Sequence, residues 1–258
     1  MEKRECNGLV FYQSTLLDDV RHGIFTRLGG VSAAPFDGLN LGGNVGDDPK
    51  SVRENHLRMY ATLEVDDRCA CTVWQVHSAD VIVASRPVAG RRWLARADAM
   101  ITDQIDIPLS MRFADCTPIL FYEPIRRVIG LAHAGWRGTV AAIASRVVQT
   151  MCQAYDLRPE AIRAVIGPAI GPNRYQVGEE VVAAVTDQYG MVDGLVKHDP
   201  HDGTAYLNLW AANHYDLTRA GVGKIEVAEI CTAENTHEFF SHRAEQGRTG
   251  RFGAVVCL

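Results

Sequence analysis

Two apolar runs constrain the fold of this chain more than any other feature. Residues 108–116 (PLSMRFADC) end at a cysteine, and residues 128–134 (VIGLAHA) carry a histidine beside their last position. Successive residues are mostly apolar in both runs, which is typical of strands that are buried on both faces. The two runs therefore predict inner strands of a layered fold, with chemistry-bearing side chains at the strand ends.

The remaining pattern mixes helices and strands without strict alternation. Ser51 and Glu54 have capping-box spacing and predict a helix from residue 51, and Thr139 is a candidate N-cap for a second helix. Further segments predict helices at 179–189 and 207–220 and strands at 73–76, 81–84, 164–166, 224–230 and 253–258. Because no repeat or long linker interrupts the chain, we expect one domain over residues 1–258. Its expected fold is α+β, a layered α/β/β/α-type sandwich of mixed sheets.

Composition narrows the classes of partner. A net charge of −5 and a pI near 6.0 give no reason to expect nucleic acid or an anionic membrane. No apolar stretch is long enough for a signal peptide or a membrane span, and the seven cysteines are odd in number and scattered. We therefore expect a cytoplasmic protein with reduced thiols. No feature of the sequence specifies an oligomeric state.

Three residues at predicted strand ends form a candidate metal site. They are His77 in WQVHSAD, Cys116 in FADCTP and His133 in HAGWRG. Imidazole and thiolate both bind zinc, and a catalytic zinc site keeps three protein ligands and one open position. No CxxC pair or HExxH helix is present, so spacing alone does not establish the site. Taken singly, each of the three residues is more often structural.

Common nucleotide and hydrolase signatures are absent from the sequence. There is no Walker A motif and no G-x-S-x-G elbow, and GLNLGGNVG lacks the strand–helix context of a dinucleotide loop. The nine histidines include no His-x-His pair. The 22 arginines against 4 lysines make any single arginine in a motif weak evidence for a binding role.

Seven strings along the chain resemble one known family. In order they are TRLGGVS, GLNLG, WQVHSAD, FADCTPIL, HAGWRG, IGPAIGP and CTAENTHEFFSHR. From about Gly23 to the C-terminus they resemble the YfiH family, also called the laccase-like or multicopper polyphenol oxidase domain family. The resemblance implies a layered α/β sandwich likened to cysteine-hydrolase toxin domains. It also implies one zinc ion held by His77, Cys116 and His133.

The resemblance further implies activity on purine nucleosides. Family members phosphorolyse adenosine, inosine and methylthioadenosine, with some adenosine deamination, so inorganic phosphate is the expected co-substrate. Arginine forks suit phosphate, and the candidates in motif loops are Arg27, Arg137 and Arg243. Asn40 and Gln75 are candidates for hydrogen bonds to the purine or ribose. No H-x-E signature is present, so the sequence assigns no proton carrier.

Four other functions fit some of the same residues. A zinc-dependent amidase that edits peptidoglycan precursors would use the same centre and differ in substrate. A copper-dependent, laccase-like polyphenol oxidase needs several copper ions, although one Cys with two His binds a single copper ion tightly. A metal-free cysteine hydrolase would use Cys116 as nucleophile and His133 as base. A structural zinc domain that binds a partner needs a fourth protein ligand.

Overall fold

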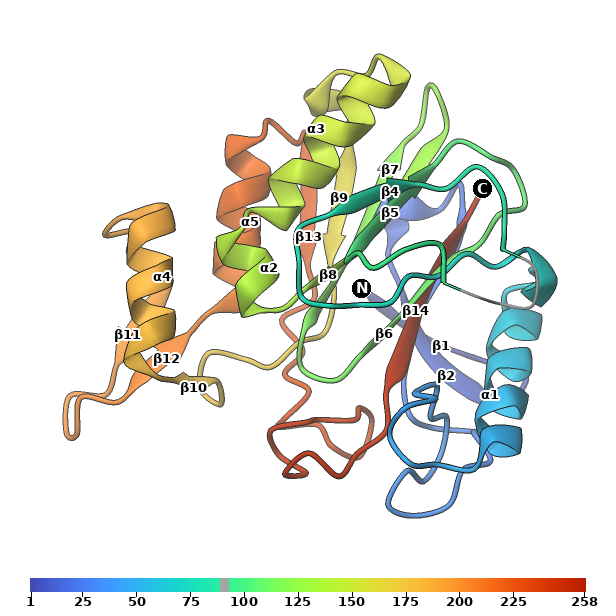
Figure 1. The fold of residues 1–258 in the computed structure, drawn as a ribbon, viewed down its shortest axis with the longest axis horizontal. Helices are drawn as coiled ribbons and strands as arrows, with labels where there is room; N and C mark the ends of the chain where they lie inside the picture. Colours follow the sequence, from blue (N-terminus) through green and yellow to red (C-terminus); the bar gives the residue numbers. More distant parts are fainter. Residues whose placement is uncertain (89–92) are drawn as a thin grey trace.

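The computed structural model describes residues 1–88 and 93–258, and its first large sheet has the strand order β1-β2-β3-β14-β6 (Figure 1). All neighbours in this sheet are antiparallel. Its strands are β1 (Glu2–Cys6), β2 (Leu9–Gln13), β3 (Arg21–Phe25), β6 (Leu109–Phe113) and β14 (Phe252–Cys257). The last strand along the chain, β14, therefore lies between β3 and β6.

The second large sheet has the order β13-β9-β7-β8-β5-β4. Its central pair, β7 (Thr117–Glu123) and β8 (Val128–Ala134), is an antiparallel hairpin, and every residue of the two strands is buried. The prediction of a doubly buried strand at 128–134 is thus confirmed. The flanking strands are β4 (Val81–Val83), β5 (Ala99–Thr102), β9 (Arg163–Ile166) and β13 (Lys224–Val227).

Three apolar clusters hold the layers together. One cluster joins the two large sheets and includes Phe113 and Leu131. A second packs α3 (Ile143–Tyr155) and α5 (Leu209–Arg219) on the outer face of the six-stranded sheet. A third packs α1 (Pro49–Thr62) on the outer face of the five-stranded sheet, and Figure 1 shows these helices on opposite sides of the molecule. Burial of each large apolar side chain contributes about 1.5–3 kcal/mol to stability, so this layering dominates the fold energetics.

A third, small sheet stands beside these layers. Its order is β10 (Gln176–Val177), β12 (Ala205–Leu207) and β11 (Val196–His198), and it carries α4 (Glu179–Tyr189) at the left of Figure 1. The short helix α2 (Trp136–Val140) connects β8 to α3. The expected mixed α+β fold is therefore confirmed, and it contains three sheets. The likeness to cysteine-hydrolase toxin domains stays a prediction.

Both predicted N-caps are wrong. Helix α1 begins at Pro49 because the Asp48 carboxylate accepts a hydrogen bond from the Ser51 amide, which places Ser51 inside the first turn. Thr139 lies in α2, where its buried hydroxyl accepts a hydrogen bond from Asn213. The helix predicted from Thr139 is split because Ala142 has φ 58°, a left-handed conformation that ends α2 and precedes α3.

Other boundaries differ from the expected ones by a few residues. The predicted strand at 73–76 is a loop whose one bridge joins Trp74 to Arg96. The sequence analysis did not predict β1, β2, β3, β5, β7, β10, β11, β12 or the 3-10 turns Thr15–Leu17, Asp67–Cys69 and Pro159–Ala161. Across residues 1–88 and 93–258, the helices are all too short or too polar to cross a membrane.

Candidate active site

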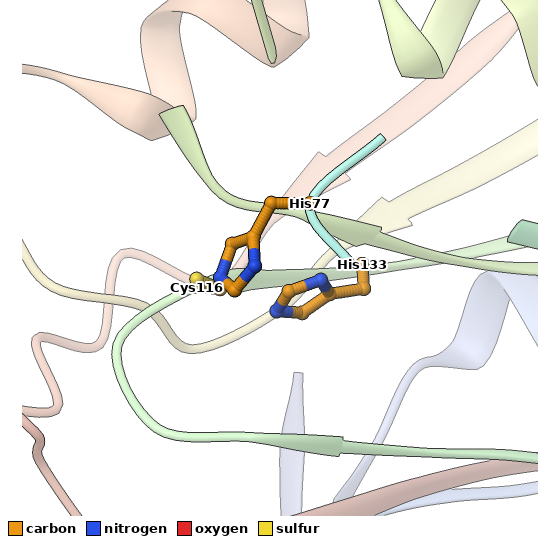
Figure 2. A group of neighbouring side chains, drawn as sticks. All are labelled: His77, Cys116 and His133. Atoms are coloured by element: carbon orange, nitrogen blue, oxygen red, sulfur yellow. The ribbon is translucent and has the colours of Figure 1, made fainter. Parts of the chain in front are cut away.

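The three predicted ligands converge at one end of the six-stranded sheet. His133 lies at the end of β8, Cys116 directly precedes β7, and His77 lies in the loop before β4. One ligand atom from each residue lies within 4.8 Å of the other two (Figure 2). The three side chains come from separate elements and point toward one another, so the prediction that they form one cluster is confirmed.

Local backbone geometry permits this convergence. A Cβ on Gly135 would lie 2.8 Å from the Cys116 sulfur and 3.1 Å from the His77 ring, so only glycine fits there. His77 itself has φ 62°, an uncommon backbone conformation for a residue with a side chain. Such conformations persist where the surrounding structure holds them, and they are common at functional sites.

A buried carboxylate, which the sequence analysis did not single out, connects the two histidines. Asp98 is fully buried and accepts a hydrogen bond from His133 Nδ1 at 2.8 Å. Its other oxygen accepts hydrogen bonds from the amides of Val76 (3.0 Å) and Ser78 (2.7 Å), the residues on either side of His77. Asp98 therefore orients one ligand directly and fixes the loop that carries the other. Its one sequence signal is a lone carboxylate before the apolar strand at 99–102.

Charge within the cluster couples Cys116 to His133 and favours the thiolate form of Cys116. Burial tends to raise the pKa of Cys116, but His133 and His77 outweigh it and lower that pKa to about 6. Burial tends to lower the pKa of His133, but Cys116 and Asp98 raise it to about 9. A thiolate is the form of cysteine that ligates metals. Since His133 Nδ1 bonds Asp98, its Nε2 is the nitrogen left for a ligand bond.

The donor set fits a catalytic zinc site. Tetrahedral zinc with these ligands places its donor atoms about 3.3–3.6 Å apart, and the observed atoms gather within 4.8 Å. Within residues 1–88 and 93–258, this is the one group of three or more His, Cys, Asp or Glu residues that could hold a metal ion. The group has three members, which corresponds to an open site rather than a closed structural one.

A cavity of about 700 Å³ opens over the three ligands. Residues of α1, α2, β6 and the loops at 41–45, 70–77 and 242–251 line it. Trp74 and Trp93 are among the residues that line the cavity. Their rings form an edge-to-face pair with centroids 4.3 Å apart, and each residue is 43% exposed. The volume suits a nucleoside-sized ligand, and the aromatic pair offers exposed ring surface to a planar group.

Two cavity arginines were not predicted as site residues. Arg112 on β6 donates hydrogen bonds to the Thr72 hydroxyl and the Val73 carbonyl, and Arg251 donates to the Thr249 and Gly250 carbonyls. Burial lowers the pKa of both guanidinium groups. In sequence, the available signal for Arg112 is a single charge inside an otherwise apolar strand.

The predicted substrate residues divide between the cavity and its surroundings. Arg137 and Arg243 line the cavity, where their guanidinium groups lie over the rings of Trp136 (4.2 Å) and Tyr175 (5.3 Å). Gln75 also lines it, but its amide is bonded to the main chain of Arg112 through both the N–H and the carbonyl.

Asn40 and Arg27 lie outside the cavity lining. Asn40 is fully buried, and its Oδ1 accepts hydrogen bonds from the amides of Gly42 and Arg251. Arg27 forms ion pairs with Asp37 and Glu245, both at 3.0 Å. The structure thus gives both side chains protein partners that hold cavity loops in place.

Similarity to known proteins agrees with this geometry. The family model described as multi-copper polyphenol oxidoreductase laccase matches residues 21–258. A purine nucleoside phosphorylase of Deinococcus radiodurans is 39% identical over 239 residues, which cover 93% of this chain and 89% of that protein. The chain belongs to the YfiH family.

Solved structures show the same fold for the whole YfiH-family chain. The crystal structure of YlmD from Geobacillus stearothermophilus has a TM-score of 0.93 at 33% identity and covers 98% of this chain and 97% of that one. The Bacillus licheniformis hypothetical protein YfiH has a TM-score of 0.91 at 32% identity, with 99% and 98% covered. The mixed fold with three sheets is therefore that of solved YfiH-family structures.

Proposed function

We propose that this YfiH-family protein is a zinc-dependent purine nucleoside phosphorylase that acts on adenosine, inosine and methylthioadenosine. The observation that carries the proposal is an open His77–Cys116–His133 group inside an arginine-lined cavity of about 700 Å³. The Deinococcus radiodurans relative carries the name of that activity. With a single group of candidate ligands in residues 1–88 and 93–258, the geometry does not favour a multicopper oxidase.

The chain supplies binding and orientation for a reaction that needs little covalent help. His77, Cys116 and His133 would hold the zinc ion, which when bound supplies a Lewis acid for an oxygen ligand. Asp98 keeps the His133 ring and the His77 loop in place for that purpose. The arginine-rich cavity stabilises anionic groups and so favours phosphate as the nucleophile.

Aromatic and cationic side chains would bind the nucleoside. Trp74 and Trp93 present ring faces for the purine, and stacking of this kind contributes about 1–3 kcal/mol per base. Arg137 and Arg243 also line the cavity, where they would bind ribose oxygens. Gln75, already bonded to the main chain of Arg112, would chiefly position that wall.

The cellular setting of this proposal is the cytoplasm. All seven cysteines lie in the described part of the chain and are free thiols, including the exposed Cys6. Reduced cysteines agree with a reducing compartment. The expected partners are nucleosides and inorganic phosphate, with no nucleic acid or membrane involved.

The test compares wild-type protein with Cys116→Ala and uses Cys6→Ala as the matched control. We expect zinc-loaded wild type to release hypoxanthine and ribose 1-phosphate from inosine only when phosphate is present. Cys116→Ala should lose both bound zinc and this activity, because a thiolate ligand is gone. Cys6→Ala should keep both, since Cys6 is exposed on β1. Zinc-free Cys116→Ala with wild-type activity would refute the proposal, and inosine formed from adenosine reports deamination in the same assay.

A metal-free cysteine hydrolase is a second candidate. In space, His133 lies between Asp98 and Cys116, which is the arrangement of an acid, a base and a nucleophile. Asp98 bonds one side of the His133 ring, and Cys116 interacts with His133 as well. Removal of zinc with a chelator separates the two functions. A hydrolase would keep phosphate-independent activity in the metal-free protein, whereas the phosphorylase would lose activity until zinc is restored.

A further inference from the structure

Arg112 is a cavity-lining cation with no acidic partner. Its Nη1 donates to the Thr72 hydroxyl at 2.9 Å and its Nη2 to the Val73 carbonyl at 3.1 Å. Across residues 1–88 and 93–258, no carboxylate oxygen forms an ion pair with it. Because a guanidinium group has five N–H donors, three remain for a ligand in the cavity.

Arg251 is a second cation that lines the cavity. Strand pairing places Arg112 opposite Gly253, and strand side chains alternate between faces, so Arg251 shares the face of Arg112. Diagonal neighbours of this kind lie about 7–8 Å apart, within the reach of two long side chains toward one ligand. The Arg251 guanidinium bonds only the Thr249 and Gly250 carbonyls among the described residues.

The protein fixes both arginines through their main chains. The Gln75 side chain accepts a hydrogen bond from the Arg112 amide at 3.0 Å and donates to its carbonyl at 2.7 Å. The Asn40 side chain accepts from the Arg251 amide at 2.8 Å. Since Gln75 lies two residues before His77, the loop that carries a metal ligand is also anchored to Arg112.

We propose that Arg112 and Arg251 form the subsite that binds inorganic phosphate beside the His77–Cys116–His133 group. Among the described residues neither arginine forms an ion pair, although the charges of Cys116 and Asp115 act on Arg251. Two such cations on one cavity wall are complementary to a doubly charged, multi-oxygen anion. The choice of phosphate rests on the proposed function. Arg137 and Arg243 serve less well for this role because each lies over an aromatic ring, and Arg243 also donates to the Gln176 carbonyl.

The subsite has a defined part in phosphorolysis. One oxygen of hydrogen phosphate forms a bond to C1′ of the ribose as the bond from C1′ to the purine N9 breaks. The purine leaves with the electron pair of that bond and takes up the proton that the phosphate carried. Arg112 and Arg251 would bind the other phosphate oxygens and orient the attacking one.

Calorimetric titration of zinc-loaded protein with inorganic phosphate, in the absence of nucleoside, tests the subsite. We expect Arg112→Gln and Arg251→Gln each to weaken phosphate binding about 10–100-fold, the range for one lost charged hydrogen-bond donor. Arg112→Lys should recover part of the affinity because it keeps the charge. Arg68→Gln is the control, since Arg68 is exposed, pairs with Asp66 and lies outside the cavity lining.

Steady-state kinetics and zinc analysis complete the test. In both glutamine variants the KM for phosphate should rise about 10–100-fold, while the KM for inosine and the zinc content stay near wild type. Wild-type phosphate affinity in both variants would overturn the subsite, even if phosphorolysis itself is observed. Loss of zinc in parallel with phosphate affinity, without recovery in Arg112→Lys, would also overturn it. Phosphate binding that depends on Arg112 without purine release would instead overturn the proposed function and leave the subsite.

Discussion

The two large sheets present different chemistry to the same cavity. At the end of the six-stranded sheet, His133 is bonded to Asp98, and Cys116 lies beside both histidines. On the five-stranded sheet, Arg112 bonds only a hydroxyl and a carbonyl among the described residues. The first region has its charges balanced within the protein before any substrate arrives, whereas the second leaves a positive charge for a ligand to balance. A metal centre needs fixed ligands, and an anion site needs free donors, so one cavity serves both.

Among the variants that test this difference between the metal-ligand group and the cavity arginines, Asp98→Asn should have the largest effect. An amide cannot accept hydrogen bonds as a carboxylate does from His133, Val76 and Ser78 together, so both histidine ligands lose their support. We expect zinc affinity to fall about 10–100-fold, as for other residues that orient metal ligands. Competition with a metal chelator measures this change.

The control for this prediction is Asp103→Asn, because Asp103 is exposed and its carboxylate accepts a hydrogen bond from the neighbouring Gln104 side chain. Phosphate affinity of the zinc-loaded Asp98→Asn protein should stay within about threefold of wild type, since the arginine wall is separate. Unchanged zinc affinity in Asp98→Asn would show that zinc binding by the His77–Cys116–His133 group does not depend on the Asp98 carboxylate.

Arg27→Gln should sharpen the contrast between a paired and an unpaired arginine. Arg27 pairs with Asp37 and Glu245 and lies over the Phe240 ring at 4.3 Å. We expect the substitution to lower the free energy of unfolding by about 2 kcal/mol, because it leaves a partly buried Glu245 without its cation. Urea denaturation measures this loss. A rise in the KM for phosphate beyond about threefold would return Arg27 to the set of phosphate ligands.

Trp74→Ala should have the smallest effect and should be confined to the nucleoside. Loss of one stacking surface of about 1 kcal/mol raises the KM for inosine about fivefold. The KM for phosphate and the zinc content should not change, since the Trp74 ring packs against Trp93 and Trp74 is neither one of the three candidate metal ligands nor an arginine of the phosphate subsite. Ile125→Ala, at a residue that is 77% exposed and lies outside the cavity lining, is the control. Equal effects on both KM values would indicate a general disturbance of the wall.

Strand-end positions, together with the family resemblance, were enough to predict the His77–Cys116–His133 group but not the residues that support it. His133 lies at the end of the buried strand β8, and Cys116 lies between the buried segments β6 and β7, so the apolar pattern marks both positions. Asp98 precedes a buried segment as well, but its role depends on His133, 35 residues away. Such a pairing follows from the antiparallel contact of β5 and β8, which no local spacing encodes.

The arginines show even more clearly that local sequence does not reveal the tertiary partners of a side chain. A motif position favoured Arg27, yet its partner Glu245 is 218 residues distant and arrives only through the tertiary fold. Arg112 lies in no glycine-rich loop, and its importance comes from what is missing around it among the described residues. Absence of a partner is a property of the packed structure, so sequence reasoning could not rank these two arginines.

The position of β14 between β3 and β6 affects how the chain folds during its synthesis. Residues 26–108 separate β3 from β6 along the chain, and β14 must insert between these two strands before the five-stranded sheet is complete. Synthesis proceeds from the N-terminus. The edge of β3 that pairs with β14 therefore has no partner until residues 252–257 have been synthesised. Until then Arg251 is also absent from the cavity. A nascent chain that stalls before this point would display an unpaired strand edge, which is the form in which this protein is most exposed to aggregation and to chaperones.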